Sequence, residues 1–222
     1  MTTTESGPDT SAVPAERPFE LGGVHHLALV CHDMARTVEF YRDVLGMPLT
    51  KTIELPAGMG QHFFFDCGGG DQLAFFWFPD GPGPAPGVAA PAARPDQGEL
   101  ASAVGSMNHV AFTVPAEKME GYRQRLIERG VPCTEIANHD DSEWGLAPTV
   151  TDEVFVRSVY FQDPDGILLE LAASTRAWRP SDVAHAPMSA ASAQAAAAAA
   201  ADAQAVTGAV DPAAPPVPSA SV

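Results

Sequence analysis

Two stretches of the chain repeat one order of apolar and polar positions. Each begins with an apolar run of strand type, over residues 23–30 and 106–114, with a histidine at the same place in the run, His26 or His109. An amphipathic helical pattern and then a Gly-x-Pro sequence follow in both stretches. Such a repeat predicts two copies of one supersecondary unit.

The first unit has the pattern of a strand, a helix and three further strands. After a strand over 22–30, Asp33 is placed to cap a helix over 34–45, and Gly46 is placed to end it. Three consecutive glycines at 68–70 predict a tight turn between the last two strands. The three strands after the helix are expected at residues 48–54, 61–67 and 71–78.

The second unit repeats this order. Its strand at 106–114 is followed by a helix that has Met119, Tyr122 and Leu126 on one face and Gly130 at its end. A polar loop is expected at 138–152. The remaining strands are expected at 132–137, 154–162 and 167–173. The two units together predict an α+β fold of two βαβββ modules.

Composition shifts divide the chain into three parts. We expect a flexible N-terminal arm over 1–20, where little can be buried, and a disordered Ala/Pro tail over 176–222. The folded domain is expected between them, at 21–175. Within it, module one covers 21–79, a Pro/Gly/Ala linker covers 80–105 and module two covers 106–175.

Charge and cysteine content exclude several classes of partner. The 222 residues carry a formal net charge of -16 without a basic patch, which argues against nucleic acid and against anionic membrane surfaces. No apolar run approaches about 18 residues, so we expect no membrane span. The first residues lack a basic segment followed by an apolar one, so we expect no signal peptide. Three cysteines without Cys-x-x-Cys spacing fit reduced thiols in the cytoplasm.

Strand parity gives the two histidines a common direction. Alternate side chains of a strand face opposite sides, so His26 and His109 share their faces with small residues, while the neighbouring positions are bulkier. This pattern is expected if helices cover the bulky face and the histidine face lines a cavity. His25 falls on the opposite face from His26 and is interpreted as structural or exposed.

A carboxylate interrupts the apolar run of the last predicted strand. Glu170 is expensive to bury there unless it is paired or bound to a metal. Together with His26 and His109, it has the composition of a site of two histidines and one carboxylate. Such a site leaves coordination positions open and suits Fe(II), although Mn, Zn, Ni or Co can use the same ligands.

Three motifs resemble the vicinal oxygen chelate superfamily. They are His-x-Ala in both first strands, Phe-Tyr-x-x-Val-Leu-Gly over 40–46, and Tyr-Phe-x-Asp-Pro-Asp-Gly-x-x-x-Glu over 160–170. That superfamily includes glyoxalase I, fosfomycin-resistance proteins, methylmalonyl-CoA epimerase and extradiol dioxygenases. The resemblance covers 21–175. It implies two βαβββ modules that form an incomplete mixed β-barrel around a metal cavity.

The resemblance also implies where the ligands lie. The metal ligands of that superfamily stand on the first and fourth strands of each module, and His26, His109 and Glu170 match three of those positions. Aligning Gly70 with Gly166 puts Ala74 at the fourth position, and alanine cannot bind a metal. Glyoxalase I and the epimerase use four ligands, so a set of three is more similar to extradiol dioxygenases and fosfomycin-resistance enzymes.

Further residues are candidates for catalysis. The similarity to extradiol enzymes implies that Tyr160 hydrogen-bonds a metal-bound substrate oxygen. Residues 151–153 stand where the signature of those enzymes has an acid–base histidine. We expect His62, on the third predicted strand, to substitute as a proton shuttle or substrate contact. His139, in the polar loop, reaches the cavity only if that loop folds over it.

The leading hypothesis is a mononuclear metal enzyme with Fe(II) as the favoured ion. It would be an extradiol-dioxygenase-like oxidoreductase that acts on a small aromatic or vicinal-oxygen substrate. One alternative is a glyoxalase-like lyase or isomerase, or a thiol transferase, of the same fold. Another is a non-catalytic protein that binds a small molecule, as bleomycin-resistance proteins do. A homodimer is compatible with each of these functions.

Overall fold

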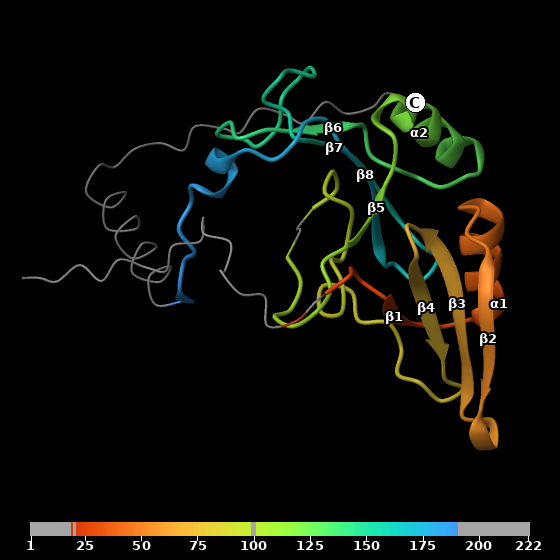
Figure 1. The fold of residues 1–222 in the computed structure, drawn as a ribbon. Helices are drawn as coiled ribbons and strands as arrows, with labels where there is room; N and C mark the ends of the chain where they lie inside the picture. Colours follow the sequence, from red (N-terminus) through yellow and green to blue (C-terminus); the bar gives the residue numbers. More distant parts are fainter. Residues whose placement is uncertain (1–18, 20, 99–100, 191–222) are drawn as a thin grey trace, which may run out of the picture. The chain divides into compact units, whose positions relative to one another are not determined.

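The computed structural model describes residue 19, residues 21–98 and residues 101–190 (Figure 1). Two units are distinguished, Phe19–Ala177 and a second unit made of Met1–Pro18 with Trp178–Val222. In the described part of the second unit, residues 178–190, a short 3-10 helix is formed, η4 (Pro180–Val183). The predicted N-terminal arm, apart from Phe19, and the alanine run of the predicted tail lie outside the described residues.

The unit Phe19–Ala177 confirms the two-module α+β fold. Each module forms a four-stranded sheet, in the orders β1-β4-β3-β2 and β5-β8-β7-β6. The first module contains β1 (His26–Cys31), α1 (Met34–Val38), the π-helical η1 (Glu39–Val44), β2 (Leu49–Leu55), η2 (Pro56–Gly58), β3 (Gly60–Gly68) and β4 (Asp71–Trp77). The second contains β5 (Val110–Thr113), η3 (Ala116–Lys118), α2 (Met119–Glu128), β6 (Ala137–His139), β7 (Val156–Gln162) and β8 (Leu168–Ser174).

Corresponding strands of the two sheets pair in the same register. In each module the first strand pairs in parallel with the fourth, which places Ala28 opposite Ala74 in one sheet and Ala111 opposite Glu170 in the other. Ala74 is therefore the structural counterpart of Glu170, as the aligned glycines predict. Neither sheet closes on itself (Figure 1).

The first helix begins as predicted and changes its pitch. The Asp33 side chain accepts a hydrogen bond from the Arg36 backbone N–H at 3.1 Å, which is the expected N-cap. After Val38 the helix widens into the π-helical turn η1. Phe40 and Tyr41 in this turn are both buried.

One continuous core lies behind the two sheets. It joins Tyr41, Phe65 and Phe75 of module one with Phe161 and Leu169 of module two, and all five side chains are fully buried. The histidine-bearing faces point away from this core, as strand parity predicts. The hydrophobic core therefore fixes how the two modules pack and leaves the opposite faces for chemistry.

The predicted strand at 132–137 forms only in part: Cys133 makes an isolated antiparallel bridge with Phe161, and the continuous ladder begins at Ala137, in β6. Pro132 has no N–H to donate. The Thr134 carbonyl accepts a hydrogen bond from Arg123 Nε at 2.8 Å, so the Tyr160 N–H bonds instead to the Thr134 hydroxyl at 3.0 Å. This side-chain substitution interrupts the ladder. Residues 137–139, the last of the predicted strand and the first two of the predicted loop, pair with β7.

Two other expectations concern the linker and the cysteines. The described residues of the predicted linker at 80–105 contain no helix or strand. All three cysteines are free, and burial raises the pKa of the Cys31, Cys67 and Cys133 thiols, which disfavours the thiolate. Over the part of the chain that the structure describes, no helix combines the length and the apolar character needed to cross a membrane.

Candidate metal centre

The second sheet brings two of the three predicted ligands together. His109 stands directly before β5, and Glu170 lies on the adjacent strand β8. The His109 Nε2 and Glu170 Oε2 atoms are 3.0 Å apart. Glu170 is almost fully buried, with 7% of its side chain exposed, while His109 keeps 36% exposed. In this pair the carboxylate is therefore buried and the imidazole is accessible to solvent.

Neighbouring side chains orient both groups. The Asn108 side-chain oxygen lies 2.7 Å from His109 Nδ1 and accepts its proton, so Nε2 is the ring nitrogen that faces Glu170. The Ser158 hydroxyl donates to Glu170 Oε1 and leaves Oε2 toward the imidazole. An imidazole nitrogen and a carboxylate oxygen that face each other need a proton or a cation between them. This donor set fits a divalent metal ion.

The surroundings keep Glu170 charged. Burial alone raises the pKa of this carboxyl, but the hydrogen bonds from His109 and Ser158 outweigh burial, so its pKa lies below the usual value. A carboxylate that stays ionised below neutral pH is ready to bind a cation. The sequence predicts that a carboxylate in this strand needs partners if it is buried, and His109 and Ser158 are those partners.

Tyr160 borders the pair from β7. It lies opposite Glu170 in the ladder, and its ring meets the His109 ring edge to face, with centroids 5.8 Å apart. Burial, and then the Glu170 charge, raise the pKa of the Tyr160 phenol to about 12. Tyr160 therefore keeps its proton at neutral pH and can donate a hydrogen bond at this place.

The structure adds His139 to this group. Its Nε2 lies 3.3 Å from the Tyr160 hydroxyl. The polar run over 138–152 predicts a loop, but His139 ends the strand β6. The Phe155 N–H bonds to the His139 carbonyl at 2.9 Å, a contact between distant residues that the sequence pattern does not reveal.

The third predicted ligand lies on the other sheet. His26 begins β1, and its ring contacts the His25 and Phe64 rings. A hydrogen bond of 2.9 Å joins the Nδ1 atoms of His25 and His26, which leaves His26 Nε2 as its free ring nitrogen. Within one chain, the described residues contain no group of three or more His, Cys, Asp or Glu side chains placed to hold a metal. One chain therefore assembles His109 with Glu170 but does not add His26.

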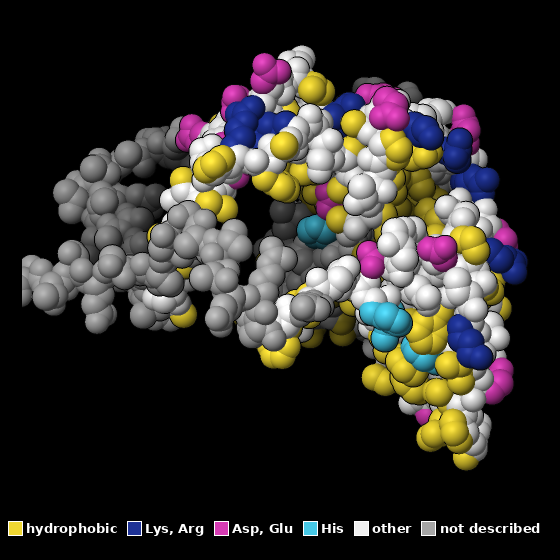
Figure 2. All heavy atoms as spheres, viewed as in Figure 1, with side chains coloured by type: hydrophobic (Ala, Val, Ile, Leu, Met, Phe, Trp, Pro, Cys, Tyr) yellow, Lys and Arg dark blue, Asp and Glu magenta, His cyan; other side chains and the backbone are white. Residues whose placement is uncertain are grey.

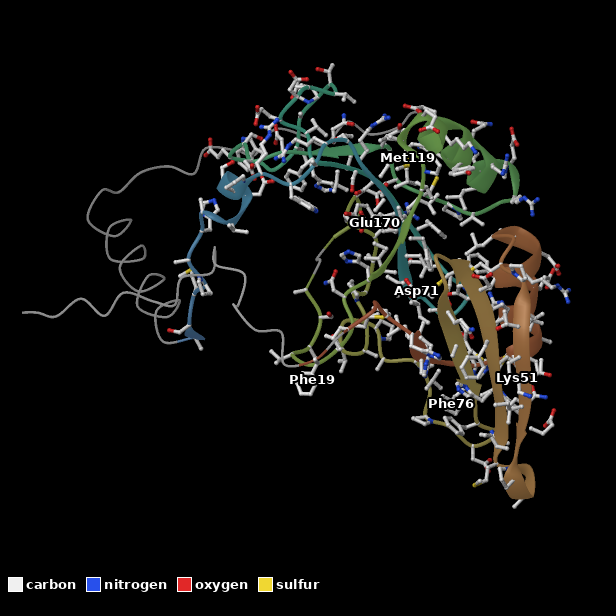
Figure 3. All side chains as sticks on the ribbon, viewed as in Figure 1. Phe19, Lys51, Asp71, Phe76, Met119 and Glu170 are labelled. Carbon is white, nitrogen blue, oxygen red and sulfur yellow. The ribbon has the colours of Figure 1, made fainter. Side chains whose placement is uncertain are left out.

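His62 belongs to an aromatic stack on the first sheet. Its ring lies flat on Phe76 at 3.6 Å and meets the edge of Phe64 at 4.3 Å, while Phe76 stacks on Phe78. The His62 Nδ1–H donates to the Phe75 carbonyl at 3.1 Å. Figure 2 shows histidine and hydrophobic side chains together on the visible face over this sheet, and Figure 3 labels Phe76 there, on a different sheet from Glu170.

A cavity of about 430 Å³ lies elsewhere. From the second sheet it is lined by Phe112 and Leu171, which face away from Glu170, and from α2 by Tyr122 and Arg125. Because it is on the helix-covered side, it is separate from the candidate metal centre.

The sequence between residues 23 and 171 matches the profile of the Glyoxalase/Bleomycin resistance protein/Dioxygenase superfamily. The chain belongs to this superfamily. The matched region includes both modules and all three predicted ligands, and the observed α+β fold and strand orders agree with it.

Similar proteins include resistance enzymes and glyoxalase-type proteins. The metallothiol transferase FosB of Shouchella clausii is 27% identical over 159 residues, which is 72% of this chain and 85% of that protein. A glyoxalase/dioxygenase from Nostoc punctiforme has 21% identity and a TM-score of 0.49, over 74% of this chain and 99% of its own. The fosfomycin resistance protein FosX from Listeria monocytogenes, solved with Mn(II) and sulfate, has 19% identity and a TM-score of 0.45, over 70% and 94%.

Proposed function

We propose that this protein is a divalent-metal-dependent enzyme that transfers a thiol to a small electrophile bearing neighbouring oxygens. The observation that carries the metal requirement is the His109–Glu170 pair, whose remaining polar atoms are held by Asn108 and Ser158. The similarity to a metallothiol transferase supports the reaction class. This choice replaces the dioxygenase as the leading hypothesis.

The third ligand is proposed to come from a second copy of the chain. His26 has a free ring nitrogen on an open sheet face, and the His109–Glu170 pair has an open side. One chain supplies both parts but does not bring them together. In a two-fold dimer, His26 of each copy can complete the pair of the other, which gives two equal sites.

The residues of the chain have separate roles in this proposal. His109, Glu170 and the partner subunit's His26 would hold the ion, which when bound supplies Lewis-acid polarisation of a substrate oxygen. Tyr160 donates a hydrogen bond to that oxygen and fixes its orientation. In the transfer, a carbon–sulfur bond forms as a carbon–oxygen bond of the electrophile breaks, and the thiol proton ends on the released oxygen.

A specific observation also favours a second candidate, an extradiol-dioxygenase-like oxidoreductase with Fe(II). Tyr160 adjoins both His109 and Glu170, as the resemblance to those enzymes implies. The aromatic stack of His62, Phe64 and Phe76 shares a sheet face with His26 and would suit a flat substrate. His62 then serves as a substrate contact.

Metal binding by calorimetry tests the shared part of both functions. We expect metal-free protein to bind one Mn(II) or Zn(II) ion per chain, and Glu170→Gln and His26→Ala each to weaken binding more than about 100-fold. His32→Ala is a matched control, because the contacts given for His32 are made by its backbone. Unchanged affinity in Glu170→Gln would show that the metal proposal is wrong.

Mixed dimers test the shared site. If His26→Ala and Glu170→Gln chains are coexpressed with different tags, the purified heterodimer has one site with both changes and one intact site. We expect one ion per heterodimer with wild-type affinity, although each variant alone binds more than about 100-fold more weakly. A heterodimer without metal binding would overturn the assembly across two copies.

Activity assays separate the reaction classes. Metal-dependent loss of free thiol in the presence of fosfomycin or a simple epoxide would support the transferase. Oxygen uptake with catechols under Fe(II) would support the dioxygenase. Tight binding of a small molecule without a metal requirement or turnover would favour the non-catalytic alternative.

A further inference from the structure

Tyr160 is held from two sides. On one side it adjoins His109 and Glu170, and on the other its hydroxyl meets His139 Nε2 at 3.3 Å, with the two rings nearly perpendicular at 86°. His139 is therefore connected to the candidate ligands through Tyr160. It contacts Tyr160, and none of the contacts given for it involves a ligand.

Strand pairing and backbone hydrogen bonds fix the position of His139. It ends β6 and pairs with Val156 of β7, and its carbonyl accepts the Phe155 N–H. The preceding residue, Asn138, closes the loop, since its carbonyl accepts the Ala147 N–H at 2.8 Å and its side-chain oxygen accepts from Arg157 Nε at 3.1 Å. These contacts place the imidazole, which is half-buried beside Tyr160.

We propose that His139 is a positioning residue that holds the Tyr160 hydroxyl beside the metal pair. This inference rests on the proposed metal site. Without His139, the phenol is free to rotate its O–H toward Glu170 or solvent. When the His139 Nε2–H donates to the phenol oxygen, the Tyr160 O–H stays available to donate a hydrogen bond to a substrate oxygen. His139 thereby selects substrates with an oxygen at that point.

The contact between His139 and Tyr160 can be observed without substrate. The chain has three tyrosines, so protein labelled with ¹³C at tyrosine Cζ gives three resonances, and Tyr160→Phe assigns one of them. We expect His139→Leu to shift the Tyr160 signal and leave Tyr41 and Tyr122 unchanged. His139→Gln, whose amide nitrogen can take the place of Nε2, should restore most of the wild-type position. A Tyr160 signal that does not respond to His139→Leu would overturn the proposal.

Binding of a chelating probe tests the role at the metal. With Zn(II) bound, we expect His139→Leu and Tyr160→Phe each to weaken 4-nitrocatechol binding about tenfold, without a change in Zn(II) affinity. Because His139 acts through Tyr160, the double variant should be no weaker than Tyr160→Phe alone. Losses that add in the double variant would contradict the proposal. Failure of the metal site itself appears separately, as absent Zn(II) binding in the calorimeter.

Discussion

The two sheets share a topology but differ in the size of the side chains on their open faces. The registers pair Glu170 with Tyr160 in one sheet and Ala74 with Phe64 in the other. One step further along, Ala172 and Ser158 correspond to Phe76 and His62. Small residues beside Glu170 leave room for a carboxylate and its partners. In the first sheet, rings fill the same space.

This difference shows that the two modules, although they share a fold, contribute different residues to the proposed site. The first sheet contributes one free histidine nitrogen and an aromatic surface, while the second contributes the charged pair and its hydrogen bonds. Neither sheet alone carries a complete set of ligands. The proposed function therefore requires both sheets. Substitutions at residues where the two modules differ, or where they contact each other, test this comparison.

The largest effect is expected from a carboxylate at Ala74. Ala74→Glu should lower the free energy of unfolding at pH 7 by about 4 kcal/mol, because Ala74 is fully buried beside Phe64 and a carboxylate there must lose its water or bind a proton. Ala74→Gln, of equal size but uncharged, should lose about half as much, through overpacking and the burial of its amide. Urea denaturation measures both. Equal losses would mean that the first sheet accepts the charge as readily as the second.

A smaller effect concerns the turns between the third and fourth strands. Module one turns through glycines, whereas module two turns through Asp163, which accepts hydrogen bonds from the Asp165 and Ile167 backbone N–H groups. Burial raises the pKa of Asp163 to about 6, against the hydrogen bonds that lower it. The folded protein thus binds more protons than the unfolded chain between about pH 4 and pH 6. The contribution of this group to stability is complete below that window and declines as the pH rises through it.

We expect this decline to be about 2–3 kcal/mol, at roughly 1.4 kcal/mol per unit of pKa. Denaturant titrations at pH 4, 5 and 6 measure it relative to Asp163→Asn, which keeps an acceptor for the backbone N–H groups and does not titrate. If wild type and Asp163→Asn show parallel pH profiles, the turn does not titrate in this range.

The same turn joins the two modules through Tyr41. Its hydroxyl donates to Asp163 Oδ2 at 3.0 Å in the buried core. Tyr41→Phe should reduce the free energy of unfolding by about 1–2 kcal/mol, because Asp163 loses a buried donor. Tyr122→Phe is a suitable control, since the contact given for the Tyr122 side chain involves its ring rather than its hydroxyl. A loss in Tyr41→Phe no larger than in Tyr122→Phe would contradict the joining role.

The smallest expected effect concerns the N-caps of the two helices, α1 and α2. Asp33 caps α1 through its side chain, but Lys118 at the same place before α2 makes no side-chain cap. Asp33→Ala should therefore cost about 1 kcal/mol, and Lys118→Ala less than about 0.5 kcal/mol. Thermal unfolding compares the two variants. Similar costs would show that the cap does not distinguish the modules.

Local patterns predicted most of the fold. The N-cap at Asp33, the turn at 68–70 and the correspondence of Ala74 with Glu170 all follow from spacing, because capping, glycine turns and strand register depend on nearby residues. The strand expected at 132–137 is interrupted because Arg123, from a helix, bonds to the Thr134 carbonyl. Such a side-chain contact leaves no mark in the hydrophobic pattern.

The sequence by itself determined the repeat, the faces of the strands and the types of residue that can bind a metal. These depend on periodicity and on side-chain chemistry. Only the tertiary structure decided that His109 meets Glu170 while His26 stays on another sheet, and that His139 reaches Tyr160. Distances between strands far apart in the chain depend on how the shared core packs the two modules, and that packing is a property of the whole fold.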